Sequence, residues 1–187
     1  MESGTKMAEP EARRPLAPRI YTNAQLFSLV ALRILIGWHF LYEGISKVTN
    51  PYWSSANYLL ESKWIFSNLF MALVSNPTAL QIVDFLNEWG QIAIGAGLIA
   101  GCFTQIATLA GIMLLLLYYI STPPLVGLTY SIPAEGSYLI VNKNLIEMAA
   151  LIVLAFFPTG HVVGLEVLIF EKDRKERKPK IKAYAGA

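Results

Sequence analysis

The chain has 187 residues, 55% of them hydrophobic, and a net charge of +2 at pH 7. Its mean hydropathy of +0.47 is typical of an integral membrane protein rather than of a water-soluble domain. The single cysteine, Cys102, excludes an intramolecular disulfide and CxxC thiol chemistry. Acidic residues interrupt the basic C-terminus, which argues against binding to nucleic acid.

Four stretches are apolar over a length close to the ~20 residues that a membrane-spanning helix needs. They are residues 24–47, about 84–102, about 103–122 and about 144–160. None of them alternates between polar and apolar residues, as a transmembrane β-strand does. The sequence therefore predicts an all-α, integral membrane four-helix bundle.

The connections between these stretches add detail to the prediction. Residues 48–83 form a long outer connection, and the stretch 64–76 within it is too short to span a membrane. It is predicted to be a short interfacial or re-entrant helix that ends at Asn76-Pro77. The connection at 102–104 is very short, so the second and third spans are predicted to pack as an antiparallel hairpin.

Basic residues are concentrated in the two tails, whereas the outer connections 48–83 and 123–143 carry few charges. The positive-inside rule therefore places both termini in the cytoplasm, as an even number of spans requires. Residues 1–20 are predicted to be a flexible tail, residues 21–170 the bundle and residues 171–187 a basic tail. Membrane lipid with anionic headgroups is the expected partner of that basic tail.

Small residues recur every fourth position in the second span, at Ala93, Gly97 and Gly101. Such ridges let helices approach closely. The ridge is predicted to serve packing inside the bundle, with a homodimer as the alternative.

The first span carries four ionisable residues, Arg33, His39, Glu43 and Lys47. At ~100° per residue, these positions fall within about a third of the helix circumference. Ionisable groups inside a membrane usually face a protein interior or a water-filled cavity. We therefore expect this helix to line a polar site.

Polar residues of the other spans are expected at the same depth in the outer half of the bundle. At about 1.5 Å per residue, Glu43 and His39 lie about 6 and 12 Å below Lys47. The residues predicted to join them are Asn87 and Glu88 in the second span, Tyr118 in the third, and Asn144 and Glu147 in the fourth.

Several chemistries fit this layer. A quinone needs hydrogen-bond donors at its carbonyls and a proton route, which His39 and a buried glutamate could supply. Lys47, His39 and Arg33 could instead bind an anion, or carboxylates and His39 could hold a metal. An ion-pair network that only stabilises the bundle is the remaining alternative. No metal is predicted, since no Glu-x-x-His pair occurs.

Haem and flavin are not expected. The only two histidines, His39 and His161, are predicted on the order of 20 Å apart along the membrane normal, which excludes a shared bis-histidine haem. The chain carries no flavin or nucleotide signature.

The string LRILIGWHFLYEGISKV at 32–48 resembles the opening helix of the DoxX/DoxD-like family of small four-helix membrane proteins. Further ordered matches are Glu88 in the second span, the Asn142-Lys143-Asn144 entry to the fourth span and the late PTG motif. The family's C-terminal pattern has an Asp where this chain has Glu166. The resemblance covers roughly residues 20–170.

This resemblance implies a membrane subunit of a quinone-linked oxidoreductase, similar to thiosulfate:quinone oxidoreductase, in a prokaryotic inner (cytoplasmic) membrane. Quinone would be the electron acceptor, and a second oxidoreductase subunit would be a partner. We predict Glu88, His39 and Glu43 as catalytic residues. The predicted substrate-binding residues are Arg33, Lys47, Asn87, Asn144, Glu147 and Tyr118. The alternatives are a non-enzymatic small-molecule or lipid-binding or transport component, and a membrane scaffold for a redox partner.

Overall fold

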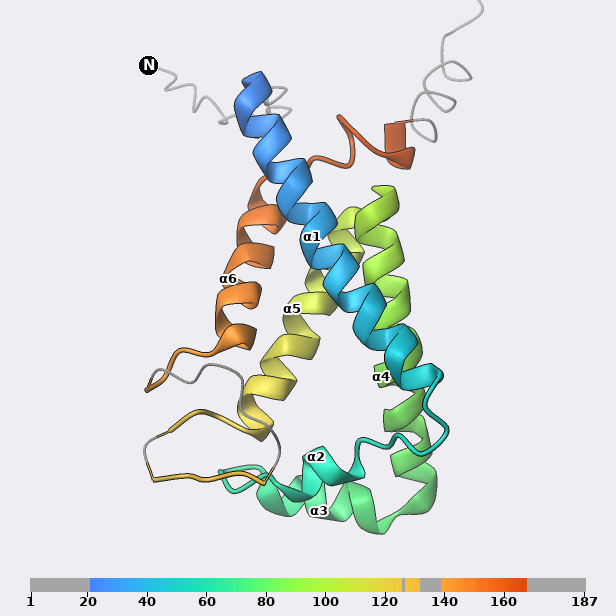
Figure 1. The fold of residues 1–187 in the computed structure, drawn as a ribbon, viewed down its shortest axis with the longest axis vertical. Helices are drawn as coiled ribbons and strands as arrows, with labels where there is room; N and C mark the ends of the chain where they lie inside the picture. The colour runs from blue at the N-terminus through green and yellow to red at the C-terminus, as the bar shows by residue number, and fades with distance from the viewer. Residues whose placement is uncertain (1–20, 126, 132–138, 168–187) are drawn as a thin grey trace, which may run out of the picture.

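The computed structural model describes residues 21–125, 127–131 and 139–167, and their regular elements are all α-helices. The all-α prediction is confirmed for these residues, whereas the predicted tails 1–20 and 171–187 lie outside them. The helices are α1 (Asn23–Val48), α2 (Ala56–Leu60), α3 (Ser67–Ser75), α4 (Pro77–Ala100), α5 (Thr104–Ser121) and α6 (Lys143–Phe156), as Figure 1 shows.

Two helices, α1 and α5, are long and apolar enough to cross a membrane. The pair of α3 and α4, bent by 106° at their junction, is a third candidate if it counts as one span. Helix α6 has 14 residues and so a length of about 21 Å, against about 30 Å for a hydrocarbon core. It stops before the predicted end of the fourth span because Pro158 disfavours a helical conformation at Phe157.

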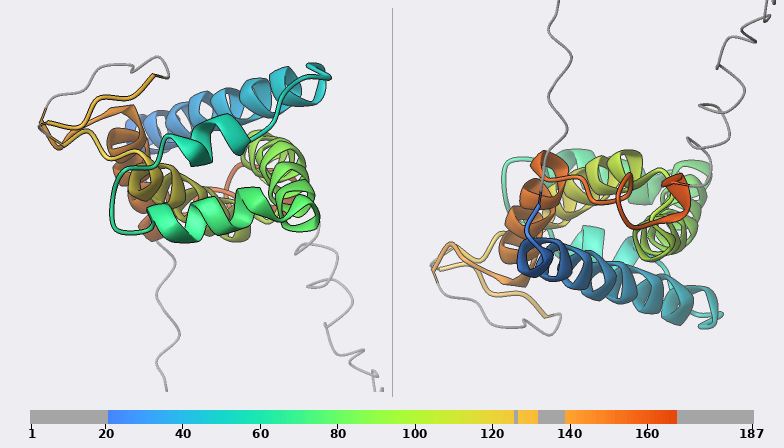
Figure 2. Two further views of the ribbon diagram at one scale, coloured as in Figure 1. Left: turned by 90° about the horizontal axis from the view of Figure 1, so that it is seen from below. Right: turned by 90° about the horizontal axis from the view of Figure 1, so that it is seen from above.

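The long helices form a ring in which each packs against two neighbours. Helix α1 contacts α4 and α6, and α5 contacts the same two helices from the other side. Successive members of the ring run in opposite directions (Figure 1). Buried apolar side chains, including Phe40, Ile94, Leu98, Leu115 and Leu151, fill the centre. Seen from below in Figure 2, α2 and α3 lie across one end of this ring.

Helix α4 begins at Pro77, seven residues before the predicted start of the second span at residue 84. Asn76 caps the helix, because its side-chain oxygen accepts hydrogen bonds from the backbone N–H groups of Thr78 and Ala79. Proline suits the first helical position, where its missing N–H costs nothing. The Asn76-Pro77 pair, predicted to end a helix, therefore both ends α3 and starts α4.

The short turn between α4 and α5 agrees with the predicted hairpin. Gly101 ends α4 in a left-handed conformation with φ 65°, which glycine adopts without steric cost.

The predicted small-residue ridge does not form the closest helix contact. Ala93 is exposed, and a Cβ on Gly97 would meet only the α4–α5 turn and the start of α5. The closest approach joins α1 and α4 instead. There a Cβ on Gly95 would lie 2.5 Å from the backbone nitrogen of Leu41 and 2.6 Å from the carbonyl oxygen of Gly37.

Replacing Gly95 with alanine is expected to lower the free energy of unfolding by about 1–3 kcal/mol, because backbone atoms of α1 occupy the space of the new methyl group. Gly90 on the same helix is the matched control, since a Cβ there meets no atom within 4 Å. Gly90→Ala should stabilise the helix by about 0.5–1 kcal/mol. Unfolding of the two variants in detergent measures both changes in free energy. Equal changes would contradict the close approach of α1 and α4 at Gly95.

Candidate functional site

A cavity of about 1080 Å³ opens at the end of the ring where α1 and α5 end and α4 and α6 begin. Its size is slightly above the usual range for small-molecule sites, which is roughly 300–1,000 Å³. Both charged and apolar side chains line it. One part of its wall is polar and comes from α1, α4 and α5, and another part is apolar and comes mainly from α3 and α4.

Lys47 is the centre of the polar wall. Its ammonium group donates hydrogen bonds to Asn87 Oδ1 and Gln91 Oε1, both at 2.8 Å, and to the Tyr118 hydroxyl at 3.2 Å. The Tyr118 hydroxyl donates to Asn87 Oδ1 at 2.9 Å and accepts from Gln91 Nε2 at 3.1 Å. The Lys47 ammonium also lies 5.0 Å from the ring centre of Trp53. Three neutral polar side chains and one aromatic ring therefore surround the positive charge.

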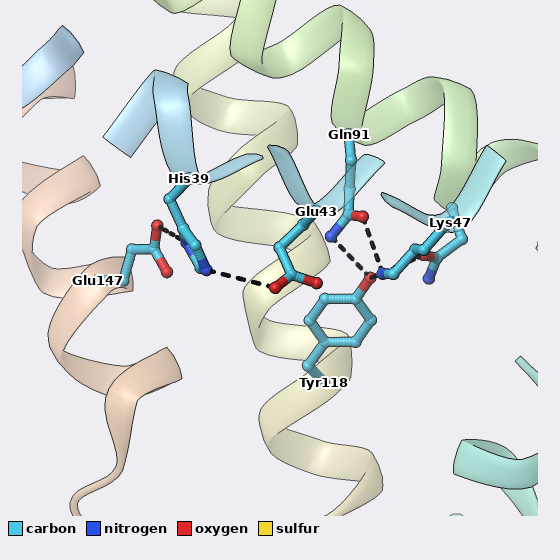
Figure 3. A network of polar contacts seen from close by, with 7 residues as sticks. His39, Glu43, Lys47, Gln91, Tyr118 and Glu147 are labelled. Atoms are coloured by element: carbon cyan, nitrogen blue, oxygen red, sulfur yellow. Dashed lines mark hydrogen bonds and ion pairs between the residues drawn. The ribbon is translucent and has the colours of Figure 1, made fainter. Parts of the chain in front are cut away.

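A second polar group lies beside the first, as Figure 3 shows. His39 Nδ1 is 2.8 Å from Glu147 Oε1, and His39 Nε2 is 4.0 Å from Glu43 Oε1. Glu147 is mostly buried, with 10% of its side chain exposed, whereas 35% of His39 and 41% of Glu43 are exposed. The row in Figure 3 runs from Glu147 through His39 and Glu43 to the Lys47 cluster.

The apolar part of the wall is formed at the bend between α3 and α4. Leu69, Phe70 and Leu73 reach it from α3, and Val83 and Leu86 reach it from α4. The cavity thus joins a charged region to an apolar one. This combination suits a ligand that carries a polar head and an apolar tail.

Two segments outside the long helices close the cavity. The Tyr58 hydroxyl donates to the carbonyl oxygen of Tyr118 at 3.0 Å and contacts Thr122 Oγ1 at 2.5 Å. Burial of the Tyr58 side chain raises its pKa, so its hydroxyl stays protonated at neutral pH.

A second pair of contacts joins the two closing segments. Lys63 donates to the carbonyl oxygen of Thr129, and Glu61 accepts from the backbone N–H of Ser131 at 3.0 Å. That N–H lowers the pKa of the Glu61 carboxyl group. The contacts hold the segment around α2 against the segment that follows α5.

The structure brings most of the predicted site residues to this cavity. The predicted residues that line the cavity are His39, Glu43, Lys47, Asn87, Tyr118 and Asn144. Glu147 joins them through its contact with His39. Glu88 does not line the cavity, and among the described residues no hydrogen bond or ion pair involves its side chain; its charge acts on Lys47 from a distance.

Arg33 lies away from the cavity. Its guanidinium group donates to Thr159 Oγ1 at 3.0 Å and to the carbonyl oxygen of Val163 at 2.8 Å, and only 4% of the residue is exposed. It therefore holds the segment after α6 rather than a cavity ligand.

Gln91 and Tyr58 are site residues that the predicted set does not include. Gln91 is one helical turn after Asn87, so the same face of α4 presents both side chains to Lys47. The spacing therefore contained the signal for Gln91. Tyr58 lies in the connection before α3, and no periodic pattern predicts where such a residue packs.

Within the described residues, no three His, Cys, Asp or Glu side chains are grouped so as to hold a metal ion. The metal alternative therefore gains no support from this geometry.

Replacing Tyr118 with phenylalanine is expected to lower the free energy of unfolding by about 1–3 kcal/mol, because a buried network loses its central hydroxyl. Tyr42→Phe is the matched control, since the Tyr42 side chain is exposed and the same loss should change stability by less than about 0.5 kcal/mol. Thermal unfolding of both variants in detergent tests the difference. A Tyr118→Phe protein as stable as the control would show that the network adds no stability.

Comparison of the chain with protein-family models, with curated proteins and with solved structures finds no match. The DoxX/DoxD-like resemblance therefore stays a prediction from the motifs.

Proposed function

We propose that this chain is an integral membrane subunit of a quinone-linked oxidoreductase of the thiosulfate:quinone type, and that its cavity is the quinone site. In this proposal α1, α4, α5 and α6 form a four-helix bundle in a prokaryotic inner membrane. Both termini face the cytoplasm, and the cavity opens in the outer half of the bundle.

Three features support this placement in the membrane. Helices α1 and α5 have the length and the apolar character of membrane spans. Successive helices of the ring run in opposite directions (Figure 1), so the start of α1 and the end of α6 lie at one end. In the sequence, the basic residues are concentrated before α1 and after residue 167, as the positive-inside rule requires if that end is cytoplasmic.

One observation carries the quinone proposal: a single cavity combines an apolar region with an imidazole and a carboxylate that are not hydrogen-bonded to each other. His39 and Glu43 both line the cavity, and His39 Nε2 lies 4.0 Å from Glu43 Oε1, which is too far for a direct hydrogen bond. A quinone has two carbonyl oxygens on a flat ring and, in membranes, an apolar tail. The ring would contact His39 and Glu43, and the tail would lie along Leu69, Phe70 and Leu86.

The remaining predicted residues receive narrower roles. The Lys47 cluster would place a positive charge near the ring, which favours the electron-rich reduced state. Asn144 lines the same cavity and would contact the bound molecule directly. Glu88 stays a sequence-based prediction of a proton carrier. The electrons would come from thiosulfate, through a second subunit if the chain alone does not oxidise it.

Quinone binding by the full chain in lipid nanodiscs tests the proposal. Trp53 lines the cavity, so a bound quinone should quench its fluorescence, and quenching should saturate with added decylubiquinone. Trp53→Phe is the control that identifies the responding residue. Absence of saturable quenching would overturn the quinone site. Equal quenching by a phospholipid analogue without a quinone ring would favour the lipid-binding alternative.

A further inference from the structure

We propose that His39 is the group that exchanges a proton with the quinone, and that Glu147 is the positioning residue that holds its imidazole. The inference rests on the proposed function and deepens it. It also separates the charged groups of the cavity into a part that can exchange a proton with a ligand and a part that cannot.

Lys47 and Tyr118 have no spare proton for a ligand. An ammonium group has three protons, and Lys47 directs them to Asn87, Gln91 and Tyr118. The Tyr118 hydroxyl uses its one proton for Asn87 Oδ1. A ligand could gain a hydrogen bond from Lys47 or Tyr118 only by breaking an existing one. The amide groups of Asn87 and Gln91 can donate hydrogen bonds but do not transfer protons, so this cluster acts through its charge and not as a proton donor.

His39 has one nitrogen engaged and one available. Nδ1 is 2.8 Å from Glu147 Oε1, which is a normal hydrogen-bond distance. An ionised carboxylate only accepts, so a neutral His39 bonded to it carries its proton on Nδ1 and presents the Nε2 lone pair to the cavity. With a second proton, Nε2 becomes a donor directed at the same space. The available nitrogen can therefore both take up and give a proton without losing its contact with Glu147.

Glu147 has the burial of a positioning residue. Only 10% of its side chain is exposed, it does not line the cavity, and its second carboxylate oxygen is buried without a hydrogen-bond partner among the described residues. A carboxylate that fixes the tautomer and orientation of a histidine is a common arrangement at proton-transfer sites.

Other charged or titratable groups line the same cavity as His39. Glu43 and Lys47 come from its own helix, Lys143 comes from α6, and Tyr58 and Tyr118 line the same cavity from α2 and α5. Glu43 is the one among them with an ion-pair distance to His39 in the structure. It is therefore the second proton carrier in the proposed reaction.

The proton balance of the reaction requires two such groups. Two thiosulfate ions are oxidised to one tetrathionate ion and release two electrons. The quinone takes up these electrons and two protons to become a quinol. We assign one proton to His39 Nε2–H and the other to the Glu43 carboxyl group, and each group regains its proton from water at the open side of the cavity.

Nitrogen-15 spectroscopy of the imidazole tests the pair directly, because the chain has only two histidines. His161→Gln leaves His39 as the single labelled ring in the full chain in nanodiscs. At a pH where the ring is neutral, the expected spectrum has the proton on Nδ1, and decylubiquinone should shift the Nε2 resonance. Glu147→Leu should move the proton to Nε2 in most molecules. Glu147→Gln should keep it on Nδ1, since the amide oxygen still accepts a hydrogen bond.

Each contrary result overturns a different part of the proposal. A proton on Nε2 in the parent protein, or no change in Glu147→Leu, would overturn the role of Glu147. An unmoved Nε2 resonance while Trp53 is quenched would overturn proton exchange by His39 but leave the quinone site intact. Absence of both signals would overturn the quinone site itself.

Discussion

Replacement of His39 with glutamine is expected to lower the rate of thiosulfate-dependent quinone reduction by about 10²–10⁴-fold, the range that a general acid or base contributes. Glutamine is similar in reach and can still form a hydrogen bond with Glu147, but it cannot take up or give a proton. The measurement follows quinone reduction in native membranes that contain the full chain and its partners. His161→Gln is the matched control, because His161 contacts Glu166 and does not line the cavity.

Binding measured in the same variant decides how the result is interpreted. Trp53 quenching should remain saturable in His39→Gln, since the apolar wall and the Lys47 cluster are unchanged. Unchanged turnover together with unchanged quenching would show that the proton travels by another group, and Glu88→Gln would then be the next variant to assay. Loss of quenching would mean that His39 contributes mainly to binding.

The meeting of His39, Glu43 and Glu147 could be predicted because it depends on two quantities that sequence alone fixes. One is the rise of about 1.5 Å per residue along a helix, which converts spacing into depth. The other is the alternation of direction between successive spans, which aligns those depths. The contact between His39 and Glu147, 108 residues apart in the chain, follows from both.

Helix rise and span direction could not predict which of two neighbouring α4 residues faces the cavity. Asn87 and Glu88 have almost the same depth, and only the rotation of α4 about its axis decides which of them faces Lys47. That rotation is set by the close approach of Gly95 to Gly37 and Leu41, a tertiary contact that involves a position outside the predicted ridge. Asn87 and Gln91 consequently face the cavity wall, while Glu88 does not line it.

The positions of the segments that close the cavity could not be predicted from the sequence either. Their positions depend on single long-range hydrogen bonds, such as those of Tyr58 with the end of α5 and of Asp84 with Ser54 and Ser55. No periodic pattern of the sequence indicates such contacts.

Replacement of Arg33 with methionine is expected to lower the free energy of unfolding by about 3–5 kcal/mol, because two hydrogen bonds of a buried charged group are lost and Glu166 loses a nearby positive charge. Arg33 binds Thr159 and Val163, and its charge interacts with that of Glu166. Glu166 in turn accepts from the backbone N–H of Thr104 at 2.6 Å, and so caps the start of α5. Without Arg33, this carboxylate would stay buried with no arginine to compensate its charge.

The double variant Arg33→Met with Glu166→Gln tests that explanation. If the uncompensated carboxylate causes most of the loss, neutralising it should recover part of the stability, and the two effects should not add. Additive losses would mean that the hydrogen bonds of Arg33 to Thr159 and Val163 account for its contribution. Because this cluster lies at the opposite end of the ring from the cavity, Trp53 quenching below the unfolding temperature should be the same in all these variants. A change in quenching would instead mean that the contacts of Arg33 also influence the shape of the distant cavity.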